Sequence, residues 1–341
     1  MLCIIQKRII QKTYCLTRQF TLRAILYQEN QSEEYTLTPE TNFTSIRREN
    51  ASFLRIAIIG APNAGKSTLI NSLVDRSICP TSSKVHTTQT KCDAVYSSEN
   101  TQLVFVDTPG LVTKHEKNRY KLSNSFEDDP KASANIADII GVVHDVSNRY
   151  TRNVLHSNVL NLLKSLQSEI PTILIINKID KLKDKTKLLE IIRILTSKTY
   201  WPNFSDVFLI SALKSDGINN LKEYLMYSAK SKNWQYNEET YTDQSMETII
   251  KQTVRAKLMD FLPNEIPYMS HLTLEHLQKS SEGGIIASVI IENSTKKKSS
   301  IIIGKNAERI KLIAQTCEKE LQYALRAPVK LILCIKTKKL T

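Results

Sequence analysis

The amino-acid sequence predicts an α/β protein in which a doubly wound, mostly parallel sheet is followed by a smaller α+β domain. Between residues 51 and 230, short β-branched apolar segments alternate with helical ones, as buried parallel strands and their crossover helices do. A glycine-bounded loop, Gly60–Thr68, joins the first apolar segment to the first helical one. Because 341 residues is also long for a single core, two domains are expected.

The alternation defines the expected elements of the first domain. The strand candidates are Arg55–Ile59, Gln102–Asp107, Ile139–His144, Thr172–Asn177 and Val207–Ser211. The helix candidates are Lys66–Val74, Val154–Gln167, Asp184–Thr196 and Asn219–Tyr227. Ligands of such sheets bind beyond the carboxyl ends of the strands, so the polar motifs that follow these strands form the candidate site.

The loop Gly60–Thr68 has the spacing G-x-x-x-x-G-K-[ST] between a strand and a helix, the context in which this motif binds phosphate. Its glycines allow backbone N–H groups to converge on phosphate oxygens, and the helix dipole favours the same anion. Lys66 is expected to contact the β- and γ-phosphates, and Ser67 to bind Mg²⁺. The expected nucleotide-binding residues here are Gly60, Asn63, Ala64, Gly65, Lys66, Ser67 and Thr68.

The motif Asp107-Thr108-Pro109-Gly110 ends the second strand candidate. The Asp107 carboxylate is expected in the Mg²⁺ shell, and the N–H of Gly110 is expected to sense the γ-phosphate. Between this motif and the phosphate loop lies the polar segment His86–Thr90, where a threonine hydroxyl would complete the Mg²⁺ coordination. The sequence therefore predicts a nucleotide site with a switch segment.

Two further motifs bear on the choice of base. Asn177-Lys178-Ile179-Asp180 follows the fourth strand candidate, and its Asp180 carboxylate can accept two hydrogen bonds from guanine that adenine cannot offer. The stem of Lys178 can cover the base, and the backbone of Ser211-Ala212-Leu213 can meet the guanine carbonyl oxygen. The expected base-site residues are Asn177, Lys178, Asp180, Ser211, Ala212 and Leu213, which makes GTP or GDP the expected ligand.

The ordered set of motifs resembles the Era family, in which a GTPase domain precedes an RNA-binding KH domain. Tyr241-Thr242-Asp243 and the C-terminal pattern add to the resemblance, which covers roughly residues 51–338. The resemblance implies that Thr87 or Thr88 binds Mg²⁺, and we place Thr88 with Ser67 and Asp107 in the expected shell. Leu111 stands where other GTPases carry a glutamine that orients water, so hydrolysis is expected to be slow, and we name no catalytic base.

The C-terminal residues fit a KH domain. Strand candidates His271–Leu277 and Ile285–Glu292 precede a loop of the G-x-x-G type, which grips the nucleic-acid backbone. Its fourth position is Ala307, which is expected to hinder a positive φ and close phosphate approach. The expected RNA-binding residues are Gly304, Lys305, Asn306, Ala307, Arg309 and Lys311.

Charge supports an anionic partner. The net charge is +13, and residues 245–341 carry 16 Lys and Arg against 9 Asp and Glu. Such clustering is typical of proteins that bind a phosphate backbone, although a membrane surface is also anionic. The resemblance implies binding to the 3′ region of small-subunit ribosomal RNA and to the pre-ribosomal small subunit. The basic surface leaves peripheral membrane association open as an alternative.

The N-terminus indicates the compartment. The first 28 residues are basic, lack acidic side chains and interleave apolar residues, which is typical of a mitochondrial transit peptide, although serine is scarce. We therefore expect a transit peptide at 1–28, a linker at 29–50, a GTPase domain at 51–230, a linker at 231–244 and a KH-like domain at 245–341. The expected location is the mitochondrial matrix, with or without contact to the inner membrane. A basic helix that stays on the protein is the alternative.

The six cysteines show no C-x-x-C spacing and no accompanying histidine cluster. Isolated free thiols and no structural metal are therefore expected.

Together, the motifs, the charge and the N-terminal pattern predict a GTP-hydrolysing, RNA-binding factor that assists maturation of the mitochondrial small ribosomal subunit. Two alternatives stay open. The first is an RNA chaperone that is switched by bound nucleotide and hydrolyses almost none of it. The second is an Era-like GTPase that acts outside mitochondria.

Overall fold

A computed structural model describes residues 50–82, 84, 91–111, 125–166, 170–263, 266–280 and 283–337. The expected transit peptide, the whole segment His86–Thr90 with Thr87 and Thr88, and the C-terminal Lys338 and Lys339 lie outside these ranges. None of the described helices is long and apolar enough to cross a membrane.

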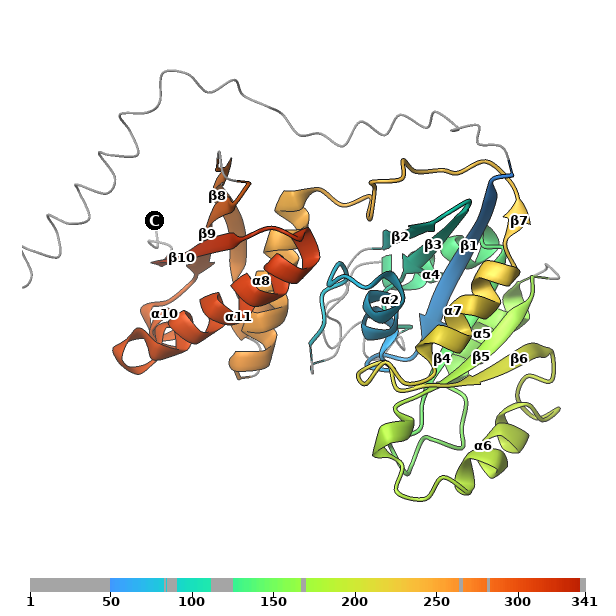
Figure 1. The fold of residues 1–341 in the computed structure, drawn as a ribbon. Coiled ribbons are helices and arrows are strands. Elements are labelled where there is room, and N and C mark those ends of the chain that lie inside the picture. The colour runs from blue at the N-terminus through green and yellow to red at the C-terminus, as the bar shows by residue number, and fades with distance from the viewer. Residues whose placement is uncertain are drawn as a thin grey trace, which may run out of the picture. The chain divides into compact units, whose positions relative to one another are not determined.

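The first sheet has the order β2-β3-β1-β4-β5-β6 (Figure 1). Its strands are β1 (Ser52–Gly60), β2 (Cys92–Ser98), β3 (Thr101–Asp107), β4 (Ile139–Asp145), β5 (Thr172–Asn177) and β6 (Phe204–Leu209). All neighbours pair in parallel except β2, which runs antiparallel to β3, and the short β7 (Lys230–Ser231), which pairs antiparallel with β1. The predicted mostly parallel sheet is confirmed.

Helices cover both faces of this sheet. Leu54, Ile56 and Ile58 of β1 face a core shared with α2 (Lys66–Val74) and α7 (Ile218–Tyr227). The alternate residues Ala57 and Ile59 face a second core, to which three further helices contribute. These helices are α4 (Ser125–Asn135), α5 (Ser157–Ser165) and α6 (Lys187–Leu195). The chain is therefore doubly wound, as predicted, and β1 is buried on both faces.

Two strands depart from the predicted pattern. β6 ends at Leu209, so Ser211 lies beyond the strand and not at its end. The edge strand β2 was not predicted, because Asp93 and two serines interrupt its apolar pattern. Its buried Asp93 is paired instead with Arg55 and with the hydroxyl of Tyr236. A charge at a buried strand position is stable here because tertiary partners compensate it.

The second sheet has the order β10-β9-β8 and lies in the C-terminal part of the chain (Figure 1). Its elements are α8 (Met246–Phe261), α9 (Ile266–Met269), β8 (His271–Lys279), β9 (Ile285–Asn293), α10 (Lys296–Ile303), the 3₁₀ turn η2 (Lys305–Ala307), α11 (Glu308–Leu325) and β10 (Val329–Thr337). Helices α8, α10 and α11 share one apolar core with the sheet. This separate α+β unit fits the predicted KH domain.

The segment 231–244, which the sequence predicts to be a linker, packs against β2 and β3. Trp234 is 1% exposed, and its Nε1 donates to the backbone oxygen of Asn100 at 3.1 Å. The side-chain oxygen of Gln102 accepts from the backbone N–H groups of residues 235 and 236, each at 3.0 Å. Further along, the N–H of Val95 donates to the oxygen of Tyr241 at 2.9 Å, which covers the open edge of β2.

Candidate nucleotide-binding site

The phosphate loop lies between β1, which ends at Gly60, and α2, which begins at Lys66. Gly65 caps α2 with φ 98°, and a Cβ built there would lie 2.3 Å from Nδ2 of Asn177. Glycine is therefore required both by the backbone conformation and by the neighbouring side chain. Ala64 is buried, Asn63 is exposed, and Thr68 lies half-buried in the first turn of α2.

Lys66 is buried beneath this loop. Its Nζ donates to the backbone oxygens of Gly60 at 3.3 Å and Ala61 at 3.1 Å. Burial lowers the pKa of Lys66 to about 8, and the nearby charge of Asp107 opposes that change. A bound phosphate would add negative charge next to this desolvated cation, so the site is better suited to an anion than to water alone.

Ser67 and Asp107 meet at the carboxyl end of the sheet. The Ser67 hydroxyl donates to Oδ2 of Asp107 at 2.8 Å, and Asp107 is fully buried. A hydroxyl and a carboxylate are hard oxygen donors of the kind that Mg²⁺ takes. Gly110 lies close to Lys66, since a Cβ built on Gly110 would be 3.3 Å from Nζ of Lys66.

Asn177 joins three of the predicted motifs. Its Nδ2 donates to the backbone oxygen of Ala64 at 2.9 Å. Its Oδ1 accepts from the N–H of Lys178 at 2.8 Å and of Ala212 at 3.0 Å. The phosphate loop and both base motifs are therefore fixed to one side chain that is 2% exposed.

The two base motifs also contact each other directly. The hydroxyl of Ser211 donates to Oδ1 of Asp180 at 2.7 Å, which orients that carboxylate at the turn η1 (Ile179–Lys181). Ser211 and Ala212 are buried, whereas the side chain of Leu213 is 76% exposed. The Leu213 side chain therefore does not take part in this packing, and only its backbone belongs to the turn.

Asp145, at the end of β4, belongs to this site but is not among the residues that the sequence motifs predict. Its Oδ2 accepts a hydrogen bond from Nζ of Lys178 at 2.6 Å, and the same Nζ donates to the backbone oxygen of Asn63 at 2.6 Å. Burial raises the pKa of Asp145, but the hydrogen bonds from Lys178 and Ser147 outweigh it and lower the pKa overall. The available signal was an Asp at the carboxyl end of a buried strand, a position that Asp107 shares.

Leu111 is buried in the second core, and its N–H donates to the oxygen of Gly60 at 3.2 Å. Its apolar side chain has no group that could orient a water molecule. The Leu111 side chain therefore cannot act on the attacking water.

The second candidate site is the loop between α10 and α11. Gly304 has φ 73°, and Asn306 and Ala307 also have positive φ, at 51° and 60°. Alanine was expected to hinder a positive φ at 307, yet the structure places it in the left-handed region. Lys305, Asn306 and Lys311 are exposed. Arg309 is half-buried and donates a hydrogen bond to the backbone oxygen of Ile301, which helps to stabilise the loop.

Comparisons with known proteins agree with this geometry. A family model described as 50S ribosome-binding GTPase matches residues 55–178. Mitochondrial GTPase Era of Danio rerio is 33% identical over 343 residues, covering 85% of this chain and 76% of that protein. GTPase Era of Ehrlichia canis is 33% identical over 287 residues, covering 83% of this chain and 92% of that protein.

The chain belongs to the Era GTPase family. Among solved structures, the crystal structure of Era in complex with MgGDPNP and nucleotides 1506–1542 of 16S ribosomal RNA has a TM-score of 0.71 at 26% identity, covering 84% of this chain and 94% of that one. A variant of Aquifex aeolicus Era bound to GDP·AlF₄⁻ has a TM-score of 0.70 at 27% identity. Both span the GTPase and the C-terminal unit, so the Era fold extends over the two domains and the chain is a P-loop GTPase.

Proposed function

We propose that this Era-family protein binds and hydrolyses GTP, and that it assists maturation of the mitochondrial small ribosomal subunit by binding the 3′ region of its ribosomal RNA. The observation that carries the nucleotide part is Asn177, which connects the phosphate loop to both base motifs. The Era structure with MgGDPNP and a 16S fragment supports the RNA part.

Each nucleotide contact has a proposed residue. The loop Gly60–Thr68 would bind the phosphates, with Lys66 as the buried cation and Gly110 next to the terminal phosphate. Asp180 would accept from the guanine ring, and the Ser211 hydroxyl would hold that carboxylate in place. Lys178 would lie against the base, because Asp145 and Asn63 fix its amino group. GTP and GDP are therefore the proposed ligands.

Magnesium fits the same site. Ser67 and Asp107 supply a hydroxyl and a carboxylate that already contact each other, and a bound Mg²⁺ would offset the phosphate charge. Thr88 is the proposed third protein donor, with Thr87 as the alternative, and both lie outside the described residues.

Hydrolysis is proposed to be slow unless RNA or the ribosomal subunit activates it. The reason is Leu111, which is buried and cannot orient water. The same observation favours a second candidate, an RNA chaperone switched by nucleotide with negligible turnover. Phosphate release, measured with and without the small-subunit ribosomal RNA, separates the two. Phosphate release that is faster in the presence of RNA supports the GTPase. Absence of phosphate release both with and without RNA supports the chaperone.

RNA binding is assigned to the loop Gly304–Ala307 with Arg309 and Lys311, and the lysines at 296–298 supply further charge nearby. A solvated basic surface that binds anionic lipid is the weaker alternative. Cosedimentation with vesicles of anionic and of neutral lipid tests it, since lipid binding of this kind requires the anionic headgroup.

The proposed location is the mitochondrial matrix, in line with the mitochondrial naming of the relatives from Danio rerio and Salmo salar. Fluorescence of a C-terminal fusion, with and without residues 1–28, tests it. Retention in mitochondria after removal of those residues would contradict the transit peptide. A full-length fusion found outside mitochondria would instead support the alternative, an Era-like GTPase that acts elsewhere.

The decisive test of the nucleotide site is Asp180→Asn. An amide presents a donor where the carboxylate presents acceptors, so guanine binding should weaken strongly and the base preference should change. Calorimetry with GDP, ADP and xanthosine diphosphate measures both effects. Asp184→Asn, an exposed aspartate on the same loop, is the matched control. Unchanged preference for guanine in Asp180→Asn would refute the assignment.

A further inference from the structure

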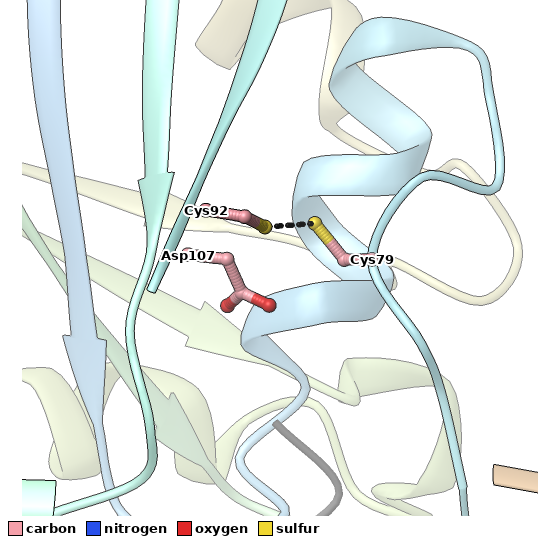
Figure 2. A group of neighbouring side chains, drawn as sticks. All are labelled: Cys79, Cys92 and Asp107. Carbon is pink, nitrogen blue, oxygen red and sulfur yellow. Dashed lines mark hydrogen bonds between the residues drawn. The ribbon is translucent and has the colours of Figure 1, made fainter. Parts of the chain in front are cut away.

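Two cysteines and an aspartate meet beneath α2, at the carboxyl end of β3 (Figure 2). Cys79 lies in the segment after α2, Cys92 begins β2, and Asp107 ends β3. All three are buried, with at most 1% of each exposed. Cys92 and Asp107 are direct partners in the β2–β3 ladder. The expectation of isolated thiols is therefore wrong for this pair, because folding brings together residues that are separated in sequence.

The distances within the cluster have the size of a metal coordination shell. The two Sγ atoms are 3.8 Å apart, and the three ligand atoms all lie within 4.8 Å of one another. Two thiolates that each lie about 2.3 Å from a tetrahedral Zn²⁺ are separated by about 3.8 Å. We propose that Cys79, Cys92 and Asp107 form a binding site for a thiophilic divalent cation, with Zn²⁺ as the natural occupant.

The protein holds these ligands in place before any ion binds. Asn71 fixes Cys79 through two hydrogen bonds, from its Nδ2 to the oxygen of Cys79 and from the N–H of Cys79 to its Oδ1, each 2.8 Å long. The β-ladder fixes Cys92 against Asp107. Because these contacts hold the backbone at both cysteines, the ion would bind without a large backbone movement.

Binding is an exchange of protons for the ion. Each thiol loses its proton as its sulfur bonds to Zn²⁺, two protons leave, and no electron is transferred. The two thiolates and the carboxylate carry three negative charges, one more than the divalent ion neutralises. The buried, positively charged Lys66 nearby compensates the remaining negative charge. Three protein ligands leave one tetrahedral position for water.

A disulfide is the main alternative, and the geometry favours it less. Its sulfur atoms would have to approach to about 2.05 Å. An external oxidant, such as a peroxide, would have to reach sulfur atoms that are both buried. Buried thiols of this kind are poorly reactive.

The site has a consequence that rests on the proposed function. Asp107 is also the proposed Mg²⁺ residue, and it accepts the hydroxyl hydrogen bond of Ser67. An ion bound to the two sulfurs would take this carboxylate, so Zn²⁺ would weaken binding of Mg²⁺ and nucleotide. The cluster would then act as an inhibitory metal site.

The first experiment measures metal binding by the full-length protein without any nucleotide assay. The reduced protein is incubated for a long time with Zn²⁺ or Cd²⁺, because buried ligands exchange through local opening, and it is then desalted. Metal content is determined by mass spectrometry, and Cd²⁺–thiolate bonds by ultraviolet absorption. We expect one equivalent of metal with a thiolate band that Cys79→Ser and Cys92→Ser each remove.

Cys317→Ser is the matched control, because Cys317 is another buried thiol but lies in the C-terminal core. It should retain the metal. Loss of a second-shell partner alone costs about 10–100-fold in affinity, so loss of a ligand should cost at least as much. Circular dichroism checks that each variant is folded, and Cys79→Ala provides a second variant at that position. Absence of bound metal in the folded wild-type protein, equal binding by folded Cys92→Ser, or loss of two titratable thiols to a disulfide would each overturn the site.

The consequence is tested separately by GDP calorimetry on metal-loaded and metal-free protein. Nucleotide affinity should fall in the loaded protein, because the bound ion occupies the Asp107 carboxylate, and it should not respond to Zn²⁺ in Cys92→Ser. Equal affinity in the loaded and free wild-type protein would refute the inhibition. A protein that binds no GDP in either state would refute the proposed function and leave the metal site standing on its own measurement.

Discussion

The Nζ of Lys178 lies 2.6 Å from Oδ2 of Asp145 and also donates to the backbone oxygen of Asn63. One amino group thus connects the end of β4, the turn after β5 and the phosphate loop. Lys178 itself has φ 66°, a conformation that these contacts help to hold. The base motif is therefore fixed by an acidic residue outside the motif.

The substitution Asp145→Asn should loosen Lys178 and weaken guanine-nucleotide binding. The salt bridge is partly exposed, so solvent screening limits its contribution to about 1 kcal/mol, which corresponds to about a fivefold loss of affinity. Calorimetry with GDP measures the change, with Asp184→Asn as the exposed control. An affinity equal to that of the wild type would show that Asp145 does not position Lys178.

The same pair predicts a pH dependence of stability. Asp145 has a pKa below its ordinary value of 3.8 in the folded protein, so its stabilising contribution is fully present above that value and is lost as the pH falls through the folded pKa. The difference in unfolding free energy between the wild type and Asp145→Asn should therefore be constant near neutral pH and shrink below about pH 4. Urea denaturation across this range measures it, and a difference that grows on acidification would contradict the assignment.

The substitution Ala307→Gly should stabilise the C-terminal domain. Ala307 has φ 60°, and the left-handed conformation costs an L-residue about 1–2 kcal/mol that glycine avoids. We expect a gain of about 1 kcal/mol in unfolding free energy, measured by denaturant titration. Ala314→Gly, in the middle of α11, should instead destabilise by about 1 kcal/mol. Equal effects of the two changes would show that Ala307 is not strained.

The substitution Trp234→Ala should release the segment 231–244 from β2 and β3. Removing a buried tryptophan costs about 3–5 kcal/mol, and the loss should appear first as local opening because the segment lies on the surface of the sheet. Limited proteolysis should cut within this segment faster than in the wild type. Tyr227→Ala, at a residue that is 93% exposed, is the control and should change little. Unchanged cleavage in Trp234→Ala would show that Trp234 does not anchor the segment.

The nucleotide motifs and the presence of the parallel strands could be predicted from the sequence because both depend on short, local residue patterns. A phosphate loop needs its glycines, lysine and serine within nine consecutive residues, and a buried parallel strand needs only a short apolar run. The edge strand β2 could not be predicted, because Asp93 is compatible with a buried strand only through Arg55 and Tyr236. The docking of 231–244 depended likewise on Gln102, a residue more than one hundred positions earlier in the chain.

By itself, the sequence determined the fold class and the motifs from which the chemistry is predicted: a phosphate loop, an aspartate proposed to select guanine, and a basic KH-like loop. Only the tertiary structure decided which side chains hold that chemistry in place. Asn177 bridges three loops, Asp145 fixes Lys178, and Cys79 meets Cys92 beside Asp107. The physical reason is that these contacts join residues far apart in the chain. A local sequence pattern does not indicate which distant residues the fold brings into contact.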